Sequence, residues 1–330
     1  MGYGYSKEEE EIMMSDMFYK AETHGVIPDI TIDSSLLMYS GLDSTAVLEQ
    51  HSSQMVSDLV SKVPDYMTDL GSSLSAFKHV PNAVGLRALV ISFLLDLIVS
   101  SLVTAPEYSP LNMMRRVFAE EKASEVRDSM DEYLKRLQKY VWEPEQVLEE
   151  TKCLEKQLSR HLTCLRNSMQ KDGQMSSRAM KIWANGAAFH AQMLIHEAWL
   201  MMAGYGTKKE KNLDVRVASV RNMVDHYRKH LEDLLDKYKS YKHTNLYFIK
   251  SQRICAAFGC SDPHCSVYDE ELGKSTPSKD EFCPESSDAY INYMFSNWGQ
   301  IEKLNEYFTD LKTNIRELIT QNRNFTMENV

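Results

Sequence analysis

The sequence predicts an all-α protein, an elongated bundle of five or more long amphipathic helices around an apolar central helix, with an apolar helical insert. Two observations indicate this fold class. Apolar residues recur at alternating steps of three and four over long stretches, whereas the apolar–polar alternation that is typical of strands is scarce. Only 13 Gly and 9 Pro interrupt the 330 residues, which favours long helices over short pieces joined by turns.

Residues 1–43 are expected to be a polar, extended segment ahead of a single elongated helical domain at 44–330. No basic region followed by an apolar core is present, so we expect no secretory signal and a cytoplasmic protein, with peripheral membrane attachment as the alternative. Gly2 and Ser6 fit the loose M-G-x-x-x-S pattern, which makes Gly2 a candidate for myristoylation. One acyl chain anchors only weakly, and the acidic run Glu8 to Glu11 would be repelled by anionic lipid. The alternative is an unmodified, frayed terminus.

The expected helices follow in order, each marked by an apolar stripe. They cover residues 44–77, 111–140, 148–169, 177–204, 213–258 and 288–318. Pro144 and Gly173 bracket the third of them. The stretch 177–204 is apolar nearly all round, so it is predicted to be the central helix, shielded on every side.

The clearest stripe keeps alternating steps of four and three over four heptads, the pattern of a coiled-coil seam. Its positions are Leu213, Val217, Val220, Val224, Tyr227, Leu231, Leu234, Tyr238 and Tyr241. Charged residues fill the opposite face, which predicts a helix solvated on one side. Continuation through "LYFIKSQRICAAF" would carry this helix to Phe258.

Residues 255–288 are expected to form a loop or cap that joins the last two helices, and they hold Cys255, Cys260, Cys265 and Cys283. Three interpretations are open. The spacing is at the edge of what zinc sites use, a local disulfide would form if the protein meets an oxidising space, and free thiols are the default in the cytosol. We assign no metal.

No motif carries a strong catalytic signal. "GKST" resembles the end of a phosphate loop, but Tyr268 stands where the first glycine should be. "HEAWL" lacks the second histidine of a zinc-protease helix, so His190 and His196 are expected to be hydrogen-bonded core residues. His226 and His230 share a helix face, but that face is strongly charged, which favours solvated side chains over a metal site. We therefore predict a protein that is not an enzyme and needs no cofactor.

Residues 83–103 are the most apolar part of the chain and are predicted to be the apolar helix. They are long enough to cross a bilayer of about 30 Å, but Arg87 and Asp96 interrupt them. On the insertion scale the large apolar residues contribute about −4 to −8 kcal/mol, and the two charges cost about 5 to 7 kcal/mol. Because these terms nearly cancel, the segment is predicted to be a conditional insertion element rather than a constitutive anchor.

The segment has one narrow polar face and one broad aliphatic face. Small and polar residues recur at helical spacing, at Gly85, Ala88, Ser92, Asp96 and Ser100. The insertion candidates on the remaining surface are Leu86, Leu89, Val90, Ile91, Phe93, Leu94, Leu95, Leu97 and Ile98. In a soluble bundle the aliphatic face would pack against 182–202, whereas in a membrane assembly Asp96 would turn inward.

The order of elements resembles the cytolysin A class of α-helical pore-forming proteins, with 44–77, 83–103 and 111–140 as the matching parts. That resemblance implies a non-enzymatic protein that stores an apolar segment against a soluble bundle and releases it on membranes. The chain departs from the class in its Cys-containing insert and in the expected lack of a secretion signal.

Two functions are therefore predicted. The first is a membrane-active helical protein, α-pore-forming in type, whose partner is a lipid membrane. The alternative is a cytosolic helical scaffold in which 83–103 is a buried core helix and the seams bind helical protein partners. Either could form a homo-oligomer. A net charge of −10 excludes a general nucleic-acid binder, because such proteins need a clustered excess of Lys and Arg.

Overall fold

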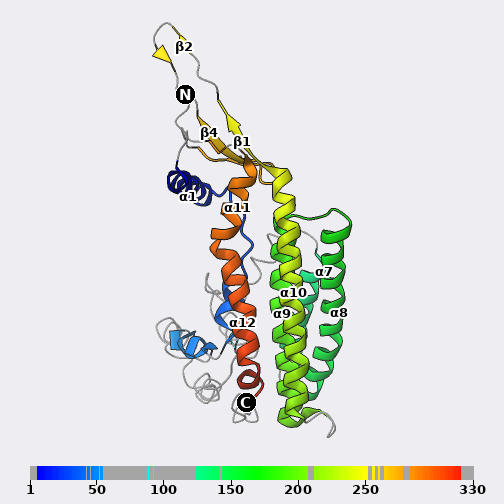
Figure 1. Ribbon diagram of the computed structural model, residues 1–330. Helices are drawn as coiled ribbons and strands as arrows, with labels where there is room; N and C mark the ends of the chain where they lie inside the picture. Colours follow the sequence, from blue (N-terminus) through cyan, green and yellow to red (C-terminus); the bar gives the residue numbers. More distant parts are fainter. Residues whose placement is uncertain are drawn as a thin grey trace, which may run out of the picture. The chain divides into compact units, whose positions relative to one another are not determined.

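The computed structural model describes residues 6–41, 43–44, 46–51, 53–54, 88, 92, 124–140, 143–206, 212–251, 255–256, 259–260, 264–277, 283–284 and 286–320. Over these residues the protein is mostly helical and carries a small antiparallel sheet of three strands (Figure 1). The helices are α1 (Lys7–Thr23), α2 (Ser34–Met38), α7 (Glu125–Lys139), α8 (Pro144–Lys171), α9 (Ser177–Leu200), the π-helical η3 (Met201–Tyr205), α10 (Leu213–Asn245), α11 (Ser287–Asn297) and α12 (Gly299–Thr320). The strands are β1 (Leu246–Lys250), β2 (Cys255–Ala256), β3 (Gly259–Cys260), β4 (Cys265–Asp269) and β5 (Lys274–Ser275).

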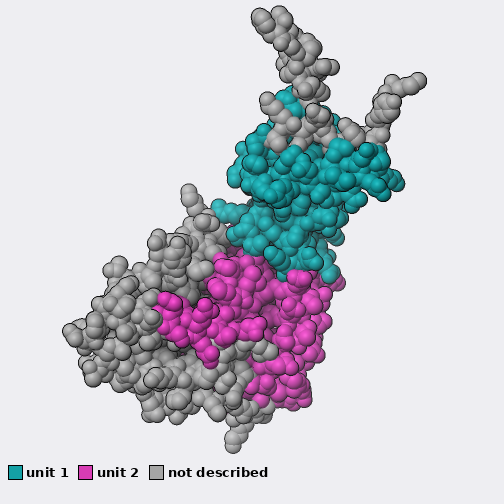
Figure 2. Space-filling view, turned by 90° about the vertical axis from the view of Figure 1, so that its left-hand side faces the viewer, with its two compact units in different colours: residues 1–31, 167–181, 231–303 teal, residues 32–166, 182–230, 304–330 magenta. Residues whose placement is uncertain are grey.

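The chain divides into two compact units, each assembled from three stretches of sequence (Figure 2). Unit 1 comprises residues 1–31, 167–181 and 231–303, and unit 2 comprises residues 32–166, 182–230 and 304–330. Residue 43, where the N-terminal segment was expected to end, is a boundary of neither unit. A single domain at 44–330 stays a prediction.

The extended N-terminal segment is wrong for residues 7–23, which form α1. A capping box starts this helix. The Ser6 hydroxyl accepts a hydrogen bond from the Glu9 amide, and the Glu9 carboxylate accepts one from the Ser6 amide at 2.8 Å. Met17 and Ala21 on its inner face are buried, so packing in unit 1 adds to the local capping.

The sheet of unit 1 replaces a predicted stretch of helix. α10 ends at Asn245, and the apolar "LYFIK" that follows is β1, paired antiparallel with β4 from Leu246 opposite Asp269 to Lys250 opposite Cys265. Extension of α10 to Phe258 is therefore wrong, as is the all-α fold over this stretch. Aromatic and β-branched residues at alternating burial favour a strand here, with Leu246 buried and Tyr247 exposed.

The last predicted helix is two helices, because Trp298 interrupts it in an extended conformation between α11 and α12. Trp298 is 2% exposed, and its ring lies 6.2 Å from that of Tyr238 and 5.7 Å from that of Phe295. Burial of this large side chain in unit 1 stabilises the break. Ser286 caps α11 by accepting a hydrogen bond from the Ala289 amide.

Several predicted stripes are confirmed as buried faces. On α10 the seam positions from Val217 to Tyr238 are all buried, and on α7 Val126, Met130, Tyr133 and Leu137 are buried. α8 begins at Pro144, and Gly173, at φ 72°, lies just beyond its end, as expected from the sequence.

Within unit 2, α7, α8 and α9 approach one another closely at Gly186. A Cβ atom on Gly186 would lie 2.5 Å from Val126 of α7 and 2.8 Å from Leu162 of α8. Nearly every residue of α9 from Ile182 to Leu200 is buried. No helix among the described residues combines the length and the hydropathy needed to cross a membrane.

Candidate functional site

The structure describes two residues of the predicted apolar helix, Ala88 and Ser92. Both are helical, and both are fully buried in unit 2. They belong to the small, polar face of the segment. The other residues assigned to the segment or to lipidation lie outside the described residues: Gly2, Gly85, Leu86, Leu89, Val90, Ile91, Phe93, Leu94, Leu95, Asp96, Leu97, Ile98 and Ser100.

Ser92 contacts Tyr39, which comes from the N-terminal part of the chain. The two hydroxyl oxygens lie 2.8 Å apart, and the Ser92 hydroxyl also lies 3.0 Å from the Ala88 carbonyl oxygen. Serine has one proton to donate. That proton is shared between the Tyr39 phenol oxygen and the Ala88 carbonyl oxygen, both of which accept from the Ser92 hydroxyl. A pair of fully buried hydroxyls is thus satisfied between elements far apart in sequence.

Tyr39 belongs to residues 32–41, which we call the strap. α2 forms its centre, with the Asp33 side chain accepting from the Ser35 amide at the helix start. Leu36 and Tyr39 are each 2% exposed, whereas Leu37 is 43% exposed. The strap therefore turns one apolar face into unit 2 and leaves the other to solvent.

Two amide side chains of α9 hold the strap by its backbone. Asn185 accepts a hydrogen bond from the Asp33 amide at 2.7 Å, and Gln192 donates one to the Ser40 carbonyl at 3.0 Å. Residues seven apart lie on the same face of a helix, about 10 Å apart along its axis. Asn185 and Gln192 thus fasten both ends of the strap, and Tyr39 reaches Ser92 from between them.

The polar residues of α9 also bond to the neighbouring helices of unit 2. His190 Nδ1 lies 2.9 Å from the Tyr227 hydroxyl of α10, and His190 Nε2 lies 3.2 Å from the Glu155 carboxylate of α8. His196 Nδ1 lies 3.0 Å from the Tyr133 hydroxyl of α7. The prediction that both histidines are hydrogen-bonded core residues is confirmed. Burial raises the pKa of Tyr227 and of Tyr133, so both phenols stay protonated donors.

Glu197 is the one acidic side chain of α9. Its pKa is raised, first by burial and then by the negative charge of Glu155, while Arg216 and Lys152 partly offset both effects. A carboxyl in this position binds its proton more tightly in the folded protein than in the unfolded chain.

Unit 1 holds a buried cluster of charges that the sequence analysis missed. Lys242 Nζ of α10 is fully buried and lies 2.7 Å from Asp269 of β4 and 2.7 Å from Glu271. Glu271 also accepts hydrogen bonds from the amide and the hydroxyl of Ser177, at 2.6 and 2.5 Å, and the Ser177 hydroxyl lies 2.6 Å from that of Tyr238. Within unit 1 the cluster ties α10, the sheet and the start of α9 together. Lys242 lies one helical turn after the seam position Tyr238, and only its long-range partners could have revealed its role.

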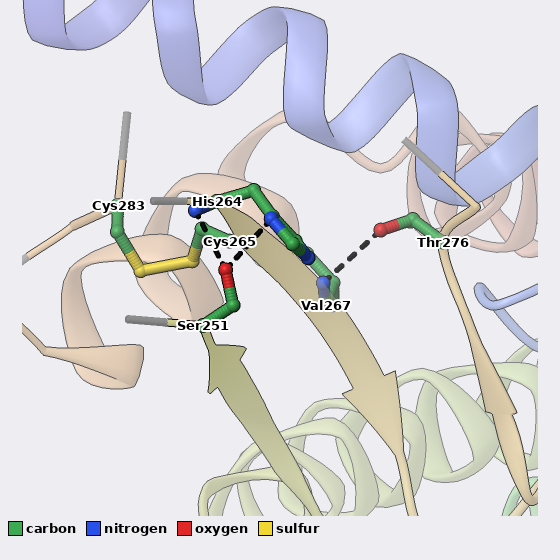
Figure 3. The surroundings of a disulfide bond; sticks show 6 residues. All are labelled: Ser251, His264, Cys265, Val267, Thr276 and Cys283. Carbon is green, nitrogen blue, oxygen red and sulfur yellow. Dashed lines mark hydrogen bonds between the residues drawn. A yellow bond between two sulfur atoms is a disulfide. The ribbon is translucent and has the colours of Figure 1, made fainter. Parts of the chain in front are cut away.

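The free-thiol interpretation is wrong for Cys265 and Cys283, which form a disulfide across 18 residues of sequence (Figure 3). Beside it, the Ser251 hydroxyl lies 2.7 Å from His264 Nδ1 and accepts from the His264 amide. The expected loop at 255–288 thus contains strands and a crosslink. Cys153 and Cys164 on α8 are free and exposed.

The two remaining candidate sites of the sequence analysis, the "GKST" sequence and the His226 and His230 pair, take part in the packing of the fold. The "GKST" sequence includes β5, and the Val267 amide of β4 donates to the Thr276 hydroxyl at 3.1 Å (Figure 3). The rings of His226 and His230 lie 4.0 Å apart. Within the described ranges, no group of three or more His, Cys, Asp or Glu side chains is arranged to hold a metal ion.

Comparisons of the chain with protein-family models, with curated proteins and with solved structures found no match. The resemblance to the cytolysin A class therefore rests on the order of elements and stays a prediction.

Proposed function

We propose that this protein is a non-enzymatic, membrane-active helical protein that stores the apolar segment 83–103 against its own strap and releases it on a lipid membrane. The contact between Tyr39 and Ser92 carries the proposal. It joins the polar face of the segment to the strap, which is held on α9 by the hydrogen bonds of Asn185 and Gln192.

The proposed architecture is an elongated bundle with α9 at its centre. Its support comes from unit 2, where polar side chains of α9 bond to Tyr133 of α7, Glu155 of α8, Tyr227 of α10 and the strap. A buried helix with partners on several sides can keep its place while a neighbouring segment leaves. The nearly balanced insertion energy of 83–103 makes release depend on conditions.

A helical scaffold is the second candidate, favoured by the full burial of Ala88 and Ser92. A permanent core helix shows the same burial, since small residues let another element approach closely. In this function 83–103 never leaves unit 2, and the partners are helical proteins.

Vesicle flotation and dye release with the full chain separate the two functions. Leu94→Asp adds about 3 kcal/mol to the insertion free energy, so it should lower vesicle binding by about 100-fold if the segment inserts. The matched control is Leu37→Asp, because Leu37 is already 43% exposed on the strap. It should bind and release dye like the wild type.

Two further variants test whether Tyr39 holds the apolar segment in place and whether Asp96 lines a pore. Tyr39→Phe removes the bond to Ser92, which should weaken storage by about 1 kcal/mol and speed dye release. Asp96→Lys reverses the charge at a similar insertion cost, so it should bind normally and reverse the preference between cationic and anionic dyes. If the wild-type protein binds vesicles of no lipid composition at any pH, the membrane function is overturned. Dye release by Leu94→Asp at the wild-type rate would show that another segment inserts.

A further inference from the structure

We infer that Cys255 and Cys260 form a second disulfide, so that the four cysteines between residues 255 and 283 make up two crosslinks, Cys255–Cys260 and Cys265–Cys283. This inference is independent of the proposed function. It identifies an oxidative modification site and its chemistry.

The register of β2 and β3 places the two cysteines opposite each other. β2 pairs antiparallel with β3, with Cys255 opposite Cys260 and Ala256 opposite Gly259. Directly opposed residues have Cα atoms about 4.5 or 5.5 Å apart, depending on the pair type. A disulfide accepts Cα distances of about 4.4 to 6.8 Å, so both spacings fit.

The other cysteines are less favourable partners for Cys255 and Cys260. Cys265 lies opposite Lys250 in the β1–β4 register and is already bonded to Cys283. Cys153 and Cys164 lie eleven residues apart on α8, about 16 Å along the helix axis, and cannot bond to each other. Cys255 and Cys260 are thus the one pair of cysteines that the described strand registers place opposite each other.

Formation of this disulfide needs an oxidant of the disulfide class, and glutathione disulfide supplies it. The two thiols lose two protons and two electrons and form one S–S bond. Glutathione disulfide takes up both and becomes two molecules of glutathione. Two disulfides in one short segment fit a protein that meets an oxidising space, in contrast to the cytoplasm expected from the sequence.

Thiol counting on the full chain tests the inference. The protein is equilibrated in a buffer of reduced and oxidised glutathione, quenched with acid, unfolded and alkylated with N-ethylmaleimide. Of its six cysteines, two should react before reduction and six after it. A cysteine that carries a glutathione adduct is counted with the reactive ones, because it is not part of a protein disulfide. Four reactive cysteines before reduction would overturn the inference.

Paired substitutions test the connectivity. Cys265→Ser with Cys283→Ser should leave two reactive thiols, because the Cys255–Cys260 bond remains. The matched control, Cys255→Ser with Cys265→Ser, removes one partner from each bond and should leave four. Four reactive thiols in the first variant, or two in the control, would overturn the pairing.

Peptide mapping of the variant with Cys265→Ser and Cys283→Ser identifies the partner of Cys255 directly, because Cys260 is then the one cysteine in residues 259–274. Trypsin cleaves after Arg253 and Lys274, and chymotrypsin cleaves after Phe258, which separates Cys255 from Cys260. In a non-reducing digest the Cys255 peptide should stay linked to the Cys260 peptide until a reductant is added. An alkylated, unlinked Cys255 peptide would overturn the inference.

Discussion

At the scale of single residues, Lys242 balances the buried carboxylate of Asp269 and the partly buried carboxylate of Glu271. Lys242→Met would leave Asp269 and Glu271 without their shared cation, and breaking a buried ion pair in this way costs about 3 to 5 kcal/mol. The measurement is the free energy of unfolding in urea. Lys237→Met, an exposed position on the same helix, is the control and should change it by less than about 0.5 kcal/mol. Equal effects of the two substitutions would show that the cluster contributes no stability.

Glu197 should make stability depend on pH. Its pKa is raised in the folded protein, so the native state holds this proton more tightly than the unfolded chain does. Stability then falls as pH rises from the unfolded pKa through the folded pKa. Glu197→Gln removes this penalty. It should raise Tm at pH 7, and it should change Tm little near pH 4, where the carboxyl is protonated in both states.

The control for this pH dependence is Glu149→Gln, an exposed position on α8. Its effect on Tm should be small and similar at both pH values. A Glu197→Gln variant whose gain in Tm is the same near pH 4 as at pH 7 would contradict the assignment of the penalty to the ionised carboxylate.

Among the elements, the contact of α9 with α7 and α8 depends on the absence of a side chain at Gly186. Alanine favours a helix by about 1 kcal/mol over glycine, but overpacking a core costs about 1 to 3 kcal/mol. The added methyl would lie 2.5 Å from Val126, whose β-branched side chain has little freedom to move. Gly186→Ala should therefore destabilise by about 1 kcal/mol in urea unfolding. Gly299→Ala, where no atom lies within 4 Å, should not destabilise, and a stabilised Gly186→Ala would mean that α7 can shift away.

The stripes of α7 and α10 could be predicted because one face of each helix is buried over most of its length. α1 and β1 could have been predicted better. Ser6 and Glu9 have the capping-box spacing, and "LYFIK" is rich in residues that favour strands. The break at Trp298 could not be predicted, because it depends on burial of one side chain among partners far along the chain.

Of the two residues in the Tyr39–Ser92 contact, only Ser92 could be singled out from the sequence. Ser92 lies on a polar stripe that helical spacing makes visible in the sequence. Tyr39 is 53 residues away in a stretch without clear periodicity, and its partner follows only from the folded structure. The same is true of Asn185 and Gln192, which look like ordinary polar residues of a helix until the strap lies across them.

At the scale of the whole molecule, net charge should govern the approach to a membrane. The formal charge is −10 with histidine neutral, and the chain holds ten histidines, so acidification removes most of the negative charge near the pI of about 5.5. At neutral pH the protein and an anionic bilayer repel each other. That repulsion weakens as pH falls, while the apolar contribution to binding that we propose for 83–103 stays constant.

The proposed membrane activity therefore predicts stronger flotation with phosphatidylserine-containing vesicles near pH 5.5 than at pH 7.4. Added salt should reduce the difference, because it screens charges beyond about 10 Å. Phosphatidylcholine vesicles should show little difference, since they carry no net charge. Leu94→Asp should lose binding at both pH values, because its cost lies in the apolar term rather than in the approach. A pH effect of equal size on neutral and anionic vesicles would contradict the charge argument and would point instead to a rearrangement within the protein as the step that acid promotes.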